Sequence, residues 1–153
     1  MIRLILATAL ITLSINTAAQ TSPPPVNRGM ASTAHPLATE AAEAIFKLGG
    51  NSIDAAIAVS LTLAVVEPSM SGLGGRAQAL VRHPDGSLQG YNGMTEIPQS
   101  FVLQKKMPSS GYTTVATPGL IALLQVLHEN HGSLPFENLI QPAIQHAWQG
   151  FAL

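Results

Sequence analysis

The chain has 153 residues, of which 46% are hydrophobic and only 10% are charged. A chain of this length forms one ordinary domain or part of a larger protein, and its apolar content supports a packed core, which excludes a largely disordered chain. Seven basic and eight acidic side chains leave a net charge of -1, so the composition gives no support to a nucleic-acid partner. The absence of cysteine excludes disulfides, thiolate metal sites and cysteine nucleophiles.

Residues 1–19 have the pattern of a secretory signal peptide. A positive charge precedes an apolar run over residues 4–15, which is too short to cross a bilayer as an uncleaved anchor. The small side chains of Thr17 and Ala19 favour cleavage before residue 20, and residues 20–28 then form a proline-rich spacer. We therefore expect an exported protein, periplasmic or extracellular, without a stable membrane span after cleavage.

Two helices are predicted in the first half of the mature chain. Apolar residues over 36–48 recur with helical spacing, and two glycines follow the last of them. A second helix is predicted over residues 51–66, with Asp54 placed to accept from free amides of its first turn. This helix is apolar nearly all round, which predicts complete burial, and a domain of this length can hardly cover it on every side.

The second half of the chain predicts a β-hairpin followed by two helices. Residues 77–83 and 87–91 form strands around a Pro-Asp-Gly turn, and residues 118–130 and 135–149 form amphipathic helices. The fold class is therefore α+β. The chain stops just after the last helix at apolar residues 151–153, which favours an interrupted domain over a finished one.

The loop over residues 71–76 contains three glycines and ends in Arg76. A phosphate-binding glycine loop follows a strand and precedes a helix, whereas this loop has the opposite order, so a nucleotide site is not expected. The Arg76 guanidinium beside free backbone amides suits a carboxylate ligand. The structural alternative is an ion pair with Glu67 or Glu96.

The remaining polar residues give no complete catalytic set. His128 and His131 share a helical face, but no carboxylate motif accompanies them, so we expect a solvated helix end and no metal site. No Gly-x-Ser-x-Gly segment is present to form a nucleophile elbow. The sequence therefore predicts no catalytic residue, no metal and no cofactor in this chain.

The order of short motifs nevertheless resembles the start of the γ-glutamyltransferase family, whose members are also called γ-glutamyltranspeptidases or glutathione hydrolases. The most specific block is GGN-x-x-DAA, followed by VVEP and SG-x-GG. The matching segments run over essentially the whole of residues 29–153, at residues 35–41, 47–58, 65–68, 71–75, 117–119, 132–136, 142–144 and 150–151.

The resemblance implies an exported or membrane-anchored N-terminal-nucleophile hydrolase with a four-layer αββα fold. Members are made as one precursor that cuts itself into a large and a small subunit. The threonine freed at the new N-terminus attacks the γ-glutamyl carbonyl, and the acyl group then passes to water or to an amino acid. Residues 29–153 would be the N-terminal portion of the large subunit. Their expected partners are the rest of that subunit, the small subunit and a small-molecule amide substrate.

Two positions depart from the family pattern. The family arginine that grips the substrate α-carboxylate lies in a Gly-Arg-Glu-x-Ala-Pro segment, and residues 93–98 match this segment with Met94 at the arginine position. Arg76 stands where a glycine usually follows SG-x-GG. We hypothesise that Arg76 takes over carboxylate binding. The alternatives are a related amidohydrolase that cleaves another acyl or small dicarboxylic amide, and a catalytically inactive, truncated interaction fragment.

Overall fold

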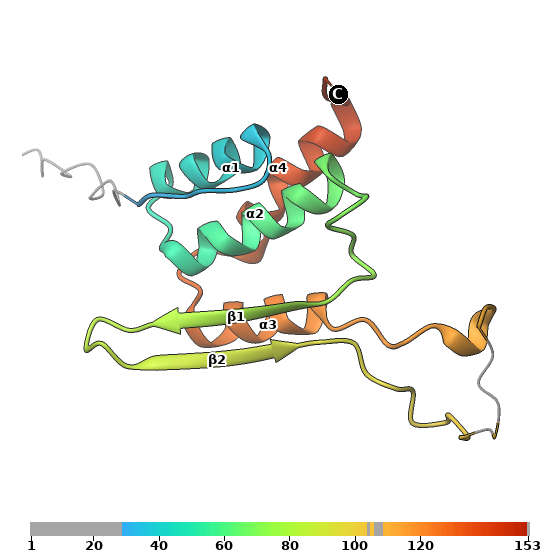
Figure 1. Cartoon of the computed structure of the whole chain (residues 1–153). Helices are drawn as coiled ribbons and strands as arrows, with labels where there is room; N and C mark the ends of the chain where they lie inside the picture. The colour runs from blue at the N-terminus through green and yellow to red at the C-terminus, as the bar shows by residue number, and fades with distance from the viewer. Residues whose placement is uncertain (1–28, 104, 106–108, 153) are drawn as a thin grey trace, which may run out of the picture.

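The computed structural model describes residues 29–103, 105 and 109–152. The predicted signal peptide at residues 1–19 and the whole of the predicted spacer at 20–28 lie outside the described residues. The elements in chain order are α1 (Pro36–Lys47), α2 (Ser52–Val66), β1 (Ala77–Arg82), β2 (Leu88–Gly93), the short 3-10 helix η1 (Tyr112–Thr114), α3 (Leu120–His131) and α4 (Phe136–Gln149). Helices and a hairpin occur together, as the predicted α+β class requires (Figure 1).

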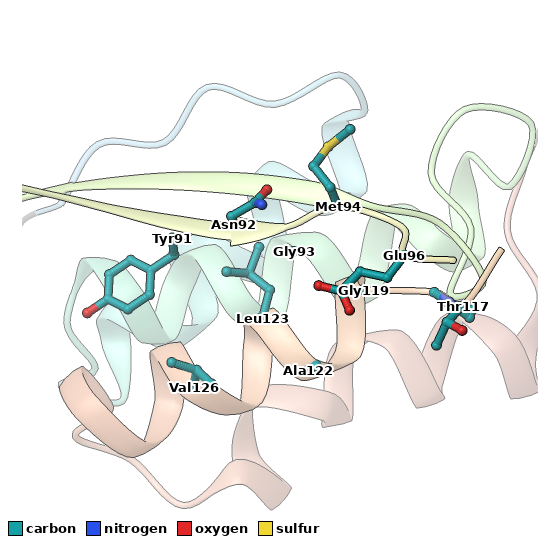
Figure 2. A pocket seen from close by; sticks show the side chains of 11 residues that line it. Tyr91, Asn92, Gly93, Met94, Glu96, Thr117, Gly119, Ala122, Leu123 and Val126 are labelled. Carbon is teal, nitrogen blue, oxygen red and sulfur yellow. The ribbon is translucent and has the colours of Figure 1, made fainter. Parts of the chain in front are cut away.

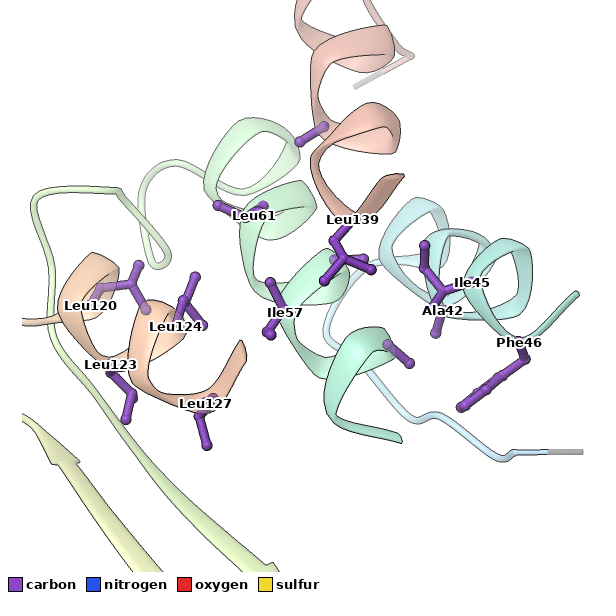
Figure 3. Close-up of a cluster of buried hydrophobic side chains, with 13 residues drawn as sticks. Ala42, Ile45, Phe46, Ile57, Leu61, Leu120, Leu123, Leu124, Leu127 and Leu139 are labelled. Atoms are coloured by element: carbon purple, nitrogen blue, oxygen red, sulfur yellow. The ribbon is translucent and has the colours of Figure 1, made fainter. Parts of the chain in front are cut away.

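Helix α2 is the centre of the packed core. Figure 3 shows the leucines of α3 on one side of α2, and Leu139 of α4 with Ile45 of α1 on the other. Ile45, Ile57 and Leu139 are fully buried. Burying an aliphatic side chain of this size contributes about 1.5–3 kcal/mol, so α2 holds the other three helices together through apolar contact.

The start of α2 is fixed by its own first residues. The Asn51 side chain accepts from the backbone amides of Ile53 and Asp54 at 2.8 and 2.9 Å, and Asp54 Oδ2 accepts from the Asn51 amide at 2.9 Å. This reciprocal capping box satisfies amides that have no partner within the helix. The predicted role of Asp54 at the helix start is therefore confirmed.

Part of α2 is left uncovered among the described residues, as expected for an apolar helix in a domain of this length. Ser52 and Ala56 are exposed, and Val59, Ser60 and Leu63 are only half-buried. The reason is that α1, α3 and α4 cover part of its circumference and leave a strip that no described element covers. The strip borders the loop that leads to β1.

The hairpin packs one face against α3 and leaves the other uncovered. Strands β1 and β2 pair antiparallel, with Ala77 opposite Gly93 and Arg82 opposite Leu88. Ala77, Ala79, Val81 and Tyr91 pack against the core, whereas Leu80, on the opposite face, is 69% exposed. In Figure 1 the hairpin runs alongside α3, and α1, α2 and α4 lie above it.

Two predicted element boundaries differ from the structure by two residues. Strand β2 continues to Gly93, beyond the predicted end at residue 91. Helix α3 begins at Leu120 instead of 118, because Glu96 and Thr117 exchange backbone hydrogen bonds of 2.8 and 3.1 Å and keep the chain extended up to that point. Among the described helices, none is long and apolar enough to cross a membrane.

Candidate functional site

Arg76 lies at the junction of the glycine loop and β1. Its side chain is exposed, and the ion pair found within the described residues joins Lys47 to Glu43 at 2.7 Å on the surface of α1. The predicted alternative, an ion pair of Arg76 with Glu67 or Glu96, is therefore absent from the part of the chain that the structure describes. The guanidinium remains available to a ligand.

Met94 occupies the next position after the end of β2, as Arg76 occupies the position before β1. Ala77 and Gly93 are the last partners of the antiparallel ladder, so Arg76 and Met94 flank that last pair. The two positions singled out in the sequence are thus brought to the same end of the hairpin.

A pocket of about 430 Å³ lies beside Arg76, and we call it the Arg76 pocket. It is formed where α2, the glycine loop, the first residue of β1 and the first residue of α3 meet. Its lining residues are Ser60, Leu63, Met70, Ser71, Gly72, Gly75, Arg76, Ala77 and Leu120. Three of these are polar side chains, and the rest of the wall is apolar or glycine.

A second pocket, of about 300 Å³, lies beside Met94 between β2 and α3. Figure 2 shows the Met94 side chain directed away from α3, while the Glu96 carboxylate lies towards Gly119. Ala122, Leu123 and Val126 of α3 form its apolar floor. Met94 and Arg76 therefore border different pockets, although both lie at the same end of the hairpin.

The glycine loop is held at both ends by backbone hydrogen bonds. The Gly75 amide donates to Gly72 O at 3.0 Å, and Gly75 O accepts from the amides of Gly119 and Leu120 at 3.2 and 3.3 Å. A Cβ atom at Gly75 would lie only 2.9 Å from Gly72 O, so this tight turn requires glycine there. The loop connects a helix to a strand, as predicted, and its shape places Arg76 at the pocket mouth.

The prediction that His128 and His131 form a solvated helix end is wrong. Both are half-buried: His128 Nε2 donates to Leu134 O at 2.8 Å, and His131 Nε2 and Tyr91 Oη share a hydrogen bond of 2.5 Å. These contacts leave no pattern in the sequence, because each partner lies on another element or in the following loop. The pair of Tyr91 and His131 joins the hairpin to the end of α3.

Among the described residues, no group of three or more histidine, aspartate or glutamate side chains could hold a metal ion. The structure brings together Arg76, two serine hydroxyls and the backbone of the glycine loop, which can bind and orient an anion. These groups do not combine a nucleophile, a general base and donors for an oxyanion. The described residues can therefore bind a ligand, but they do not form a complete catalytic set.

Comparison with known proteins agrees with this geometry. The family model described as "Gamma-glutamyltranspeptidase" matches residues 38–153. The capsule biosynthesis protein CapD proenzyme of Bacillus anthracis is 38% identical over 120 residues, covering 78% of this chain and 21% of that protein. The glutathione hydrolase proenzyme of Pseudomonas sp. (strain A14) is 32% identical over 160 residues, covering 97% of this chain and 28% of that protein.

Solved structures show the same relationship. The γ-glutamyltranspeptidase of Helicobacter pylori superimposes with a TM-score of 0.72 at 30% identity, covering 81% of this chain and 38% of that one. The cephalosporin acylase of Bacillus halodurans superimposes with a TM-score of 0.73 at 34% identity, covering 88% and 28%. The chain thus spans about a quarter of the curated relatives, since it covers 21% and 28% of the first two.

These similarities confirm the predicted fold class. The described helices and hairpin are part of the α+β, N-terminal-nucleophile hydrolase fold with αββα layers. The glycine loop and Arg76 fall inside the matched residues 38–153, as does the Asp54 capping box. The chain therefore belongs to the γ-glutamyltranspeptidase family.

Proposed function

We propose that this chain forms the N-terminal portion of the large subunit of a self-processing enzyme that hydrolyses or transfers the acyl group of γ-glutamyl amides of the glutathione type. The observation that carries the proposal is the family match over residues 38–153, together with relatives that are named as glutathione hydrolase proenzymes. The nucleophile would be an N-terminal threonine outside these residues, and its α-amino group would accept the hydroxyl proton. The rest of the large subunit and the small subunit would complete the active site.

The proposed division of the chain places a signal peptide at residues 1–19, a proline-rich spacer at 20–28 and the large-subunit portion at 29–153. The apolar run and the small residues before position 20 support export to the periplasm or the medium. Edman sequencing of the exported protein tests this division, because cleavage would give an N-terminus at Gln20. An N-terminus at Met1 in the exported fraction would contradict it.

Within this enzyme we propose that Arg76 binds the carboxylate of the substrate. The support is its exposed side chain, the absence of an ion-pair partner among the described residues and its place at the same end of the hairpin as Met94. A guanidinium offers two parallel donors to a carboxylate, and such pairs are the stronger class of hydrogen bond. Met94 cannot provide this contact, because a thioether is at most a weak acceptor.

A second candidate function is an N-terminal-nucleophile amidohydrolase that accepts another acyl group. The apolar Met94 side chain and the similarity to a cephalosporin acylase at 34% identity favour it. In both functions the acyl group passes from the amide to the threonine oxygen and then to water or an amine. They differ only in which acyl groups the binding residues accept.

The test is expression of the chain together with all polypeptide that its gene encodes after Leu153. Self-cleavage into two subunits, release of p-nitroaniline from γ-glutamyl-p-nitroanilide, and loss of both after substitution of the new N-terminal threonine are the expected results. Cleavage without γ-glutamyl activity, but with release from other acyl anilides, would favour the second candidate. A gene that encodes nothing after Leu153, with no activity, would leave an inactive interaction fragment and refute both enzyme functions.

A further inference from the structure

The first turn of α1 depends on a histidine side chain. Pro36, at the first helical position, has no N–H to satisfy. The amides of Ala38 and Thr39 donate to His35 O at 3.0 and 3.3 Å. The Leu37 amide donates instead to His35 Nδ1 at 3.2 Å, so the imidazole is the N-cap of the helix. Because a backbone amide can only donate, Nδ1 carries no proton while this bond is present.

The protonation state of His35 follows from this hydrogen bond. In the neutral ring the proton lies on Nε2, and Nδ1 keeps the lone pair that accepts from the Leu37 amide. An imidazolium ion carries a proton on both nitrogens and has no lone pair left, so rotation of the ring does not restore the bond. Protonation of His35 and capping of α1 by its side chain therefore exclude one another.

The position of His35 makes a charged ring unfavourable for a second reason. The free amides of a first helical turn give it a partial positive charge, which repels a cation. The first turn of α1, residues 36–39, contains no acidic side chain that would offset this charge. The rings of His35 and Phe151 form a T-shaped pair, but their centroids are 6.4 Å apart. Since an aromatic ring attracts a cation within about 6 Å, Phe151 offsets little of the cost.

Other titratable side chains lie at this end of the helices. They are Glu40 on α1, Glu67 at the end of α2 and His146 in the last turn of α4. In the part of the chain that the structure describes, none of them forms a hydrogen bond or an ion pair with His35. These groups, and any that the rest of the enzyme adds, can change the pH at which His35 gains its proton. They cannot change the requirement that an accepting Nδ1 carries no proton.

The backbone around the cap is held by hydrogen bonds that do not titrate with the imidazole. Thr33 Oγ1 donates to His35 O at 2.8 Å and shares a hydrogen bond of 2.7 Å with Thr39 Oγ1. Threonine hydroxyls do not change charge in the pH range in which an imidazole does. Protonation of His35 therefore removes the side-chain cap and leaves these bonds around it in place.

We propose that His35 is a pH-sensitive cap of α1. The neutral imidazole accepts from the Leu37 amide and closes the first turn, and protonation removes the acceptor and opens that turn. Histidine is the side chain whose charge ordinarily changes between about pH 5 and 8. Because the capped state excludes the proton, the stability of the first turn falls as the pH falls. The inference needs neither the amide chemistry nor the export proposed above.

Hydrogen–deuterium exchange of the whole polypeptide that the gene encodes tests the cap at about pH 8 and about pH 5. Mass spectrometry of peptides from residues 36–47 gives the exchange rates, and division by the intrinsic rates at each pH gives protection factors. We expect the protection of the first turn of α1 to fall about fivefold between the higher and the lower pH. Peptides from the start of α2 are the internal control, because its cap is the Asn51 side chain, which does not titrate.

Three variants assign the response to His35. Asparagine caps a helix at either pH, so His35→Asn should keep the same protection under both conditions. Alanine offers no acceptor, so His35→Ala should show at both pH values the low protection that the natural protein has only at the lower one. His146→Asn should retain the full response, which separates His35 from the neighbouring histidine of α4.

The inference is overturned if the first turn of α1 in the natural protein keeps its protection at the lower pH. It is also overturned if His35→Asn or His35→Ala loses as much protection as the natural protein does, or if the response disappears in His146→Asn. Exchange needs no substrate, so a gene product without amidase activity tests the cap equally well. Absence of activity would therefore refute the proposed function alone, and absence of the pH response would refute the inference alone.

Discussion

Asp54 and Ser133 are joined by two kinds of hydrogen bond across 79 residues of sequence. The Ser133 amide donates to Asp54 Oδ1 at 3.0 Å, and the Ser133 hydroxyl donates to Asp54 Oδ2. Asp54 is fully buried, so these bonds replace the water that its carboxyl group loses on folding. The first turn of α2 is thereby fixed to the loop between α3 and α4.

Asp54→Ala should lower the free energy of unfolding by about 3 kcal/mol. The substitution removes the acceptor of the Ser133 and Asn51 amides, and these part-buried donors then lose the partner that they have in the fold. Urea unfolding followed by circular dichroism measures the change. Ser133→Ala keeps the amide contact and should cost only about 1 kcal/mol, so equal losses for the two variants would contradict a central role of the carboxyl group.

Gly119→Ala should separate the hairpin from α3. A Cβ atom at Gly119 would lie 2.4 Å from the carbonyl oxygens of both Gly93 and Met94, and backbone oxygens cannot move aside without shifting β2. We expect a loss of about 1–3 kcal/mol in the free energy of unfolding. Gly90→Ala is the control on the same hairpin, because a Cβ there has no neighbour within 4 Å. A loss at Gly90 as large as at Gly119 would show that strand propensity, not close contact, determines the effect.

Tyr91→Phe should weaken the contact between the hairpin and the end of α3. The substitution removes the hydrogen bond of 2.5 Å to His131 Nε2 and keeps the aromatic ring in its edge contact with that imidazole. We expect about 1 kcal/mol less stability by thermal or urea unfolding. Tyr112→Phe should have no measurable effect, since Tyr112 is 90% exposed. Equal stability of the Tyr91 variant and the natural chain would show that the bond makes no net contribution.

Ser87→Ala should raise the pKa of Asp85 towards its ordinary value. Hydrogen bonds from the Ser87 hydroxyl at 2.7 Å and the Ser87 amide at 2.9 Å stabilise the charged carboxylate and lower this pKa, and the hydroxyl is the larger cause. A carboxyl whose pKa is lower when folded stabilises the fold above its unfolded pKa, and this contribution is lost as pH falls through the folded pKa. NMR titration of the Asp85 carboxyl carbon measures the shift, and an identical pKa in the variant would contradict the assigned cause.

The parts of the fold that depend on residues close together in the sequence could be predicted. Asn51 and Asp54 form a capping box within four residues, and such local chemistry leaves a readable pattern. The partner of Asp54 could not be predicted, because Ser133 is an ordinary loop serine in sequence. The same limit explains His131, whose partner Tyr91 is on another element.

The sequence predicts which residues belong to the candidate site, but not how they are placed relative to one another. Arg76 and Met94 stand out in the sequence because they depart from the family pattern, but the second strand is predicted to end at Tyr91. The structure extends β2 to Gly93, where a Cβ atom would lie 2.6 Å from Leu123 Cβ and 2.9 Å from Gly119 O. Only the register shows that Arg76 and Met94 flank the same last pair of the ladder, Ala77 and Gly93.

The bond between Asp54 and Ser133 also determines when the helical core can close during synthesis. A ribosome that adds about 5–20 residues per second produces Ser133 roughly 4–16 s after Asp54, given the separation of 79 residues. For most of that interval the apolar α2 has only α1 among the helices to pack against, since α3 is completed just before Ser133 and α4 follows it. The nascent chain therefore exposes an apolar helix for seconds, and slower translation of residues 67–132 would prolong its exposure.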